Sequence, residues 1–193
     1  MRLNRIIQGP ALAAGILASN AHAGLTQWRV EDGGNGHWYE AVTEYTSISW
    51  TAARDAAAAR GGHLATLTSA SENAWVFANV ASDPSIWFGD GVWLGGYQDL
   101  SAPDYSEPTG GWRWITGETW SYTNWAPSEP NNGNGSGQHF LQLWDQGQIT
   151  DKWDDHWVNG TSASRSYIVE YAVPAPSALV VLLGPGLLRR RRA

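Results

Sequence analysis

The most informative part of this sequence is Asn124-Trp-Ala-Pro-Ser-Glu-Pro-Asn-Asn132, followed about twenty residues later by Lys152-Trp-Asp-Asp155. Each segment places carboxylate or amide oxygens beside a tryptophan, and Pro and Asn mark the first as loop backbone. Oxygen ligands on a shaped loop are what a hard cation such as Ca²⁺ selects. If the two segments converge in space, they predict a calcium site that is open to solvent on one side and can accept two neighbouring hydroxyls of a sugar.

Tryptophan dominates the candidate core. The chain has 193 residues, with 13 Trp against three Phe and no Cys. This length suffices for one domain with a hydrophobic core, and each buried Trp removes about 150–250 Å² from water. Without cysteine the chain has neither disulfides nor a thiolate metal site, so packing must hold the fold together.

Charge is distributed unevenly along the chain. Of 12 basic residues, two lie in the first five positions and four in the last five, whereas all 18 acidic residues fall within 24–172. That span therefore has six basic residues and a formal charge of −12. Such an acidic domain is a poor match for nucleic acid, whose phosphates require a basic face. It is compatible with cation binding.

Residues 1–23 are typical of a secretory signal peptide. Arg2 and Arg5 supply the positive start, Ala11–Leu17 supplies an apolar stretch, and Ala21-His-Ala23 offers a small-residue cleavage site. We therefore expect export, with residues 24–172 as the mature domain.

Residues 173–193 form a second segment that we expect to lie outside the fold. No charged residue occurs from Tyr171 to Leu188, and four arginines follow. Together with Val173-Pro-Ala-Pro-Ser177, this pattern resembles the PEP-CTERM sorting signal of Gram-negative bacteria. The resemblance implies transient retention at the inner membrane, removal by an exosortase, and release to the cell surface or an extracellular matrix. Ala175 stands where that signal has Glu, so a transmembrane anchor is the alternative.

The segment between these ends predicts early helices and late strands. Ser49 can cap a helix that ends before Gly61-Gly62. Ser69 with Glu72 forms a capping box for a second helix that ends near Asn79. Strands are expected at 37–42, 63–67, 92–94, 140–144, 152–153 and 167–171. Because helices precede most strands instead of alternating with them, the order indicates an α+β fold.

Eight short motifs in this segment occur in a defined order. They are His37-Trp-Tyr39, Trp50 with Ala53, Gly61-Gly-His-Leu64, Trp93-Leu-Gly-Gly96, Thr116-Gly-Glu118, Tyr122-Thr-Asn-Trp125, Glu129-Pro-Asn131 and Trp153-Asp-Asp155. The ordered set resembles the C-type lectin-like domain family. That resemblance implies two short helices, small antiparallel sheets and a long irregular loop region. The family's usual disulfides are absent.

The same resemblance implies a ligand set. Glu129 and Asn131 match the family's Glu-Pro-Asn loop, whose proline follows a cis peptide bond. Asp154 and Asp155 match its Trp-Asn-Asp strand, with Asp154 in place of asparagine, and Gln138 falls where the family has a further glutamate. These five residues are therefore expected to bind Ca²⁺ and a carbohydrate together.

Two positions depart from the family's pattern. Gln138 is an amide where the family has an acid, and Asp154 is an acid where the family has an amide. Three carboxylates are retained, and the number of carboxylates is a main determinant of calcium affinity. Gln138 and Asp154 nevertheless reverse the hydrogen-bond donor and acceptor that they offer a sugar hydroxyl, so no particular sugar is predicted.

We thus predict an exported, calcium-dependent carbohydrate-binding protein that recognises a surface or matrix polysaccharide and is not an enzyme. One alternative is a structural or protein-interaction member of the same fold, in which Pro-Asn-Asn-Gly is an ordinary surface turn. Another is a polysaccharide hydrolase, for which the sequence singles out no acid pair. Its candidate acids are Glu118, Glu129, Asp145, Asp154 and Asp155.

The loop Gln98–Glu107 is a candidate for a second calcium site. Its acids Asp99, Asp104 and Glu107 are either ligands or ordinary solvated side chains, and the sequence leaves both interpretations open.

Overall fold

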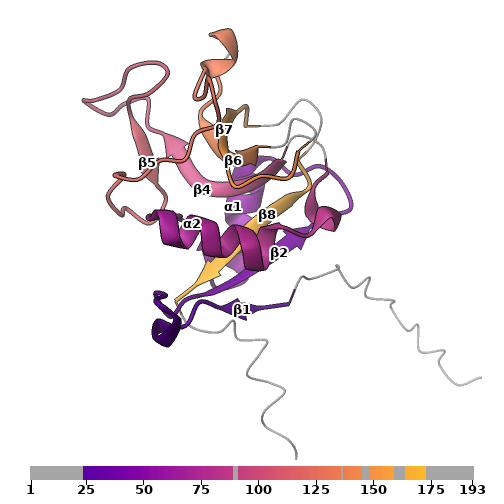
Figure 1. Ribbon diagram of the computed structural model, residues 1–193. Coiled ribbons are helices and arrows are strands. Elements are labelled where there is room, and N and C mark those ends of the chain that lie inside the picture. Colours follow the sequence, from indigo (N-terminus) through magenta and orange to yellow (C-terminus); the bar gives the residue numbers. More distant parts are fainter. Residues whose placement is uncertain (1–23, 89–90, 136, 145–147, 159–163, 173–193) are drawn as a thin grey trace, which may run out of the picture.

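A computed structural model describes residues 24–172 apart from 89–90, 136, 145–147 and 159–163 (Figure 1). The expected signal peptide and the expected sorting segment lie outside the described residues, so their boundaries stay predictions. Within the described part of the chain, no helix combines the length and apolar content needed to cross a bilayer.

The strands form one mixed sheet in the order β1-β2-β8-β4-β6-β7, with β3 on β8 and β5 on β4. Only β4 and β8 among these pairs run parallel. The strands are β1 (Thr26–Gln27), β2 (Trp38–Thr43), β3 (His63–Leu64), β4 (Gly91–Gln98), β5 (Trp112–Trp114), β6 (Phe140–Trp144), β7 (Trp153–His156) and β8 (Ser166–Tyr171). The α+β class is confirmed, and the strands share a single sheet.

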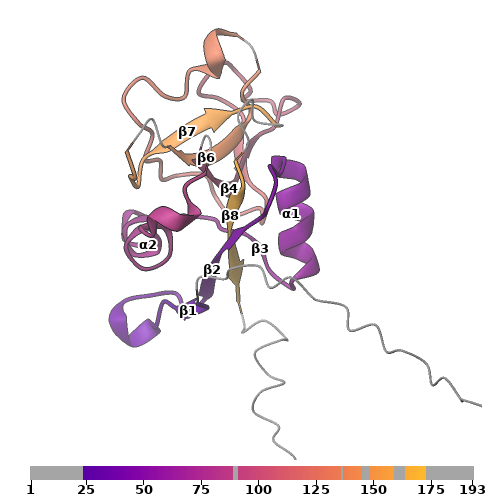
Figure 2. The same cartoon turned by 90° about the vertical axis from the view of Figure 1, so that its right-hand side faces the viewer.

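Two helices flank this sheet from opposite sides, α1 (Trp50–Ala59) and α2 (Ala70–Val76), as Figure 2 shows. Ser49 accepts a hydrogen bond from Ala52 N and begins α1 as expected. Short helical turns complete the set: η1 (Val30–Asp32), η2 (Phe77–Ala81), η3 (Pro84–Ile86) and η4 (Asn132–Asn134).

The start of α2 differs in one detail from a capping box. Ser69 Oγ accepts from Glu72 N at 3.2 Å, as expected. The Glu72 carboxylate, however, accepts from Thr68 N at 2.7 Å, one residue before the cap. Glu72 is buried, and Tyr39 and Asn35 also donate to its carboxylate.

The core lies on both sides of the sheet. Trp50, Ala53 and Ala57 of α1 are buried against Trp93 and Tyr167. On the α2 side, indoles contact one another directly. The ring of Trp114 lies 4.5 Å from that of Trp120 and 5.7 Å from that of Trp153, the latter edge-on at 85°. Edge-to-face and offset aromatic pairs add stability beyond the area that they bury.

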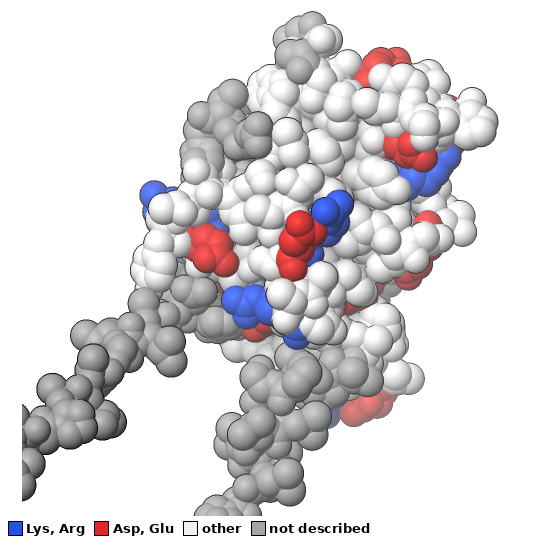
Figure 3. Space-filling view, turned by 180° about the vertical axis from the view of Figure 1, so that it is seen from behind, with Lys and Arg blue, Asp and Glu red and all other residues white. Residues whose placement is uncertain are grey.

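The face opposite to that of Figure 1 is largely uncharged. Figure 3 shows acidic and basic side chains there in small mixed groups on a surface that is mostly neutral. The described residues of this face form no extended basic patch for a nucleic acid.

Candidate functional site

The two segments singled out in the sequence lie side by side. Trp153 N donates to Asn124 O at 3.0 Å, and Ala126 N donates to Trp153 O at 2.8 Å. Trp125 and Trp153 thereby form a parallel bridge. The loop that follows Ala126 is consequently brought to the edge strand β7.

Asp155 ties this loop to β7. The side chain is 1% exposed, and its two oxygens accept from Asn131 N at 2.9 Å and from Asn132 N at 2.7 Å. Backbone amides that point at a carboxylate stabilise its charged form. Asn132 has a positive φ of 54°, a conformation that asparagine tolerates better than most residues.

Glu129 and Asn131 contact each other across the proline between them. Asn131 Nδ2 donates to Glu129 Oε1 at 2.8 Å, and Asn131 Oδ1 accepts from Gly133 N at 2.6 Å. The peptide bond from Glu129 to Pro130 is cis, as the family resemblance implied. Asn131 lies in the same loop as Glu129 and is exposed.

Three carboxylates converge at this edge of the sheet. Glu129, Asp154 and Asp155 each offer an oxygen, and these oxygens lie within 4.8 Å of one another. Burial, followed by repulsion from Asp154 and Asp155, raises the pKa of Glu129 to about 8. A divalent cation among the three would offset their mutual repulsion, which is the electrostatic condition for a metal site.

Two buried oxygens at the site have no hydrogen-bond donor among the described residues, Glu129 Oε2 and Gln138 Oε1. A buried acceptor without a donor costs free energy, so such atoms are rare and point to an ion or water in the functional state. Gln138 is 6% exposed, and its backbone amide donates to Asn132 Oδ1 at 2.9 Å. Asn132 thereby links Gln138 to Asp155.

The structure thus brings Glu129, Asp154 and Asp155 together, bonds Asn131 to Glu129, and connects Gln138 to Asp155 through Asn132. Sequence reasoning missed two further residues, Asn132 and Gln142. The signal for Asn132 was its place in an Asn-Asn-Gly turn. The signal for Gln142 was a polar residue between two leucines, because strand alternation puts it on the other face.

The candidate second calcium loop has a different organisation. Asp99 Oδ1 accepts from Ser101 Oγ at 2.7 Å, Asp104 pairs with Arg113, and Glu107 accepts from Tyr105. Among the described residues these acids do not form a cluster of three potential ligands. Their local partners favour the interpretation that they are solvated, hydrogen-bonded side chains.

The acids proposed for hydrolysis are divided between two places. Glu118 accepts from Thr66 and Thr116 at 2.7 Å each, in a network that reaches Glu170. It is not one of the three converging acids, and Asp145 lies outside the described residues.

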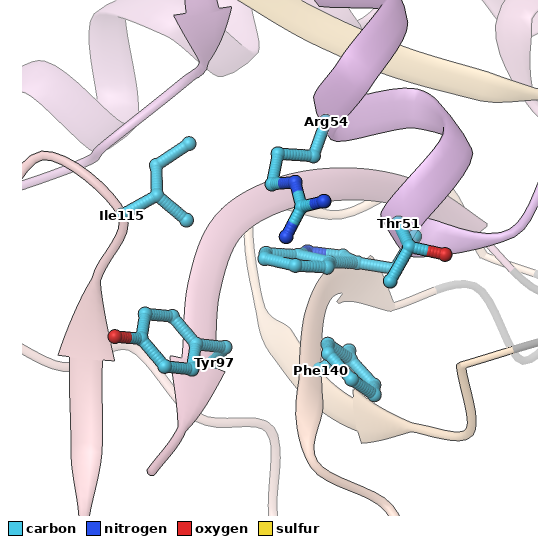
Figure 4. A pocket seen from close by; sticks show the side chains of 6 residues that line it. Thr51, Arg54, Tyr97, Ile115 and Phe140 are labelled. Atoms are coloured by element: carbon cyan, nitrogen blue, oxygen red, sulfur yellow. The ribbon is translucent and has the colours of Figure 1, made fainter.

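A separate hollow of about 440 Å³ lies between α1 and the strands β4 and β6. Figure 4 shows Arg54, Tyr97, Ile115 and Phe140 arranged around this hollow. Arg54 lies 5.9 Å from the Trp50 ring and is paired with Asp55 at 2.8 Å. The hollow offers aromatic faces without an acidic cluster, so it is a rival location for a ligand that needs no metal.

Comparison with known sequences adds family information. Residues 46–163 match the profile described as the Lectin C-type domain. A perlucin-like protein of Mytilus galloprovincialis is 32% identical over 87 residues, which are 45% of this chain and 50% of that protein. A type-2 ice-structuring protein of Brachyopsis segaliensis is 29% identical over 90 residues, 47% of this chain and 45% of that protein. The chain spans about half the length of these curated relatives.

Solved structures share the fold. The cow C-type carbohydrate-recognition domain of CD23, crystallised in the presence of a GlcNAc2Man3 oligosaccharide, superposes with a TM-score of 0.55 at 22% identity over 72% of this chain and 90% of that chain. The C-type lectin CEL-I from Cucumaria echinata gives 0.52 at 23% identity over 69% and 89% of the two chains. At these identities the likeness shows the fold alone.

Proposed function

Because this chain belongs to the C-type lectin domain family, we propose that it is an exported, calcium-dependent carbohydrate-binding protein that recognises a surface or matrix polysaccharide. One observation carries the proposal: three carboxylates from two distant segments meet within 4.8 Å. The buried oxygens of Glu129 and Gln138 that have no donor at this place support it. An oxygen-rich set of this kind matches the preference of Ca²⁺.

The residues that would hold the ion are Glu129, Asn131, Gln138, Asp154 and Asp155. Bound Ca²⁺ would supply positive charge and open coordination positions for two neighbouring sugar hydroxyls. The side chains would contribute the rest of the recognition. A carboxylate accepts a hydrogen bond from a sugar hydroxyl, and an amide NH₂ donates one to it. The proposed set contains three carboxylates and the amides of Asn131 and Gln138, so it offers a sugar hydroxyl both kinds of group.

Calcium titration of the chain tests whether it binds the ion. We expect saturable heat of binding in isothermal titration calorimetry, and we expect Glu129→Gln with Asp155→Asn to abolish it. The matched control is Glu31→Gln with Asp32→Asn, which removes two negative charges from the exposed turn η1. If the intact chain showed no calcium binding, the proposal would fail.

A glycan array tests whether the chain binds a carbohydrate in the presence of calcium. Binding is expected with Ca²⁺ and is expected to vanish in EDTA or in the Glu129→Gln/Asp155→Asn variant. Binding that persisted in EDTA and was lost in Tyr97→Ala would place the contact in the hollow of Figure 4 instead.

The second candidate function is a structural or protein-interaction role on the same fold. It is favoured by the similarity to a protein named as an ice-structuring protein, which shows that matching sequences are not all named as lectins. Calcium binding with no signal on any glycan would support this candidate against the first.

We propose binding without catalysis. The hydrolase hypothesis requires two carboxylates with distinct acid and base roles at about 5–5.5 or 6.5–9.5 Å. The three acids at the site each offer an oxygen within 4.8 Å of the other two, and such a cluster of three resembles a cation-binding arrangement more than an acid–base pair. Release of reducing ends from a polysaccharide by the chain, lost in Glu129→Gln, would contradict this proposal.

Export, exosortase processing and release to the surface of a Gram-negative bacterium are further proposals. They rest on the sequence of residues 1–23 and 173–193, which lie outside the described residues. Mass spectrometry of the protein recovered from its cell would test them. Cleavage after Ala23 and loss of the terminal arginines are the expected products.

A further inference from the structure

Gln142 lies directly behind the site, in the middle of β6. It is the cross-strand partner of Asp154 on β7, and its side chain is 0% exposed. Gln142 Nε2 donates to Asp154 Oδ2 at 2.8 Å. A buried amide that donates to a buried carboxylate makes a hydrogen bond stronger than that between two neutral groups.

The Gln142 amide is itself held in one orientation. Ser164, also 0% exposed, donates its hydroxyl to Gln142 Oε1 at 3.2 Å. With the amide reversed, Oε1 would face Asp154 Oδ2, and two acceptors would meet without a proton between them. Ser164 therefore favours the orientation in which the NH₂ group faces Asp154.

Space for this arrangement depends on the glycine that begins β4. A Cβ atom on Gly91 would lie 3.0 Å from Gln142 Oε1 and 2.2 Å from Leu143 O. The φ of Gly91 is +139°, which side-chain-bearing residues rarely adopt. Gly91 of β4 thus leaves room for the amide that Ser164, before β8, holds by a hydrogen bond.

From these contacts we propose that Gln142 is a positioning residue that orients the Asp154 carboxylate for calcium. The inference rests on the proposed function, because it assumes that Asp154 is a ligand. Residues that hold metal ligands in place contribute about 10–100-fold to metal affinity. The sequence gives no hint of this role beyond a single polar residue in an apolar strand.

A purely structural hydrogen bond is the competing explanation. It would change the stability of the fold and leave the calcium affinity of the folded chain unaltered. The two roles are therefore separated by measuring calcium dissociation constants and calcium-free unfolding on the same variants.

The first test replaces Gln142 by Met, which is similar in length and lacks the donor. We expect Gln142→Met to weaken calcium binding by about ten-fold or more, as measured by calorimetry on the chain. Gln98→Met is the matched control: Gln98 is also buried, and it bonds to Gly110 O at 2.8 Å and to His139 at 2.8 Å, in a different network. Its calcium affinity should equal that of the unsubstituted chain.

The second test exchanges donor and acceptor. Asp154→Asn alone should weaken calcium binding, because a carboxylate is lost. Gln142→Glu alone should also weaken calcium binding, because the side chains at positions 142 and 154 then present two acceptors to each other. In the Gln142→Glu background, however, Asp154→Asn restores the bond with its direction reversed and should strengthen calcium binding. The same substitution is thus expected to act with opposite sign in the two backgrounds.

The outcomes distinguish this inference from the function on which it rests. If the unsubstituted chain binds no calcium, both fail. If it binds calcium, and Gln142→Met has the same dissociation constant within two-fold, only the positioning role fails. An effect of Asp154→Asn with the same sign in both backgrounds would also overturn the positioning role.

Discussion

Asp155 Oδ1 accepts a hydrogen bond of 2.9 Å from the backbone amide of Asn131, a residue 24 positions earlier in the chain. This bond, with its neighbour from Asn132, organises the loop before any ion is considered. Asp155→Ala should therefore lower the unfolding free energy in EDTA by about 1–3 kcal/mol. Urea denaturation, monitored by tryptophan fluorescence, measures this unfolding free energy. An Asp155→Ala midpoint equal to that of the unsubstituted chain would show that the loop is held by other contacts.

Calcium itself should stabilise the fold. A ligand that binds only the native state adds about 2.7 kcal/mol at a concentration 100 times its dissociation constant. The melting temperature should rise with calcium, fall back on addition of EDTA, and stay unchanged in Glu129→Gln/Asp155→Asn. Equal concentrations of sodium chloride, matched for ionic strength, are the control. A rise of the same size in the variant would place the ion elsewhere.

Asn73 joins α2 to the aromatic core. Its Oδ1 accepts from Trp153 Nε1 at 2.7 Å, and both side chains are buried. Asn73→Ala leaves the indole NH without an acceptor, and we expect a loss of about 1–3 kcal/mol in unfolding free energy. The control is Ser71→Ala, an exposed position of the same helix. Equal stabilities of the two variants would contradict the assignment of this bond as stabilising.

Gly91 should tolerate no side chain. Gly91→Ala places a Cβ against Leu143 O and strains a positive φ, so we expect a loss of more than about 2 kcal/mol in unfolding free energy. Gly24→Ala is the control, because a Cβ there meets nothing within 4 Å. Chemical denaturation of both variants measures the difference. A stable Gly91→Ala variant would mean that β4 and β6 can separate at this end.

His37 should make stability depend on pH. Its hydrogen bond to Glu170, at 2.6 Å, raises the pKa of His37 above 6.5, with Glu72 and Glu118 contributing in the same direction. The folded state therefore binds the proton more tightly than the unfolded state. The stabilisation is complete below pH 6.5 and is lost as pH rises through the folded-state pKa.

The size of this effect is limited, because His37 is partly exposed to solvent. We expect a change below about 1 kcal/mol between pH 6 and pH 8. Urea unfolding at both pH values should show that the free energy of unfolding changes less with pH in His37→Gln than in the unsubstituted chain. His63 Nδ1 also lies near Glu170, at 3.9 Å from Oε2, so His63→Gln is the necessary comparison. An unchanged slope in His37→Gln would assign the effect to other groups.

Local signals in the sequence were sufficient for the helices and most strands. Ser49 caps α1 as predicted. This cap could be recognised because it depends only on a hydroxyl residue that directly precedes the apolar face of the helix. The strands β1 and β5 have two and three residues, too few for a period of two to be recognised. The parallel pairing of β4 with β8 was also not predictable, since it depends on chain segments far apart in sequence.

In the candidate site, too, some residues could be predicted from the local sequence and others depended on the pairing of distant segments. Glu129, Asp154 and Asp155 were predicted from motif order, and the fold brings them together. Asn132 and Gln142 were missed because each acts through another residue. The role of Gln142 can be recognised only when β6 is known to pair with β7 in the register that places Gln142 opposite Asp154. A sequence gives residue types, whereas such roles depend on register.

Trp38 of β2 pairs on one side with Gln27 and on the other with Tyr171, so the first and last strands of the described fold both flank β2. The sheet order puts β7 at the far edge from β1, and Figure 2 shows them at opposite ends of the molecule. Anything joined to either end of residues 24–172 therefore attaches at the β1 end of the molecule, whereas Asp154 and Asp155 lie on β7 at the opposite edge of the sheet. A domain immobilised on a bead by either terminus should capture ligand from the surrounding solution equally well.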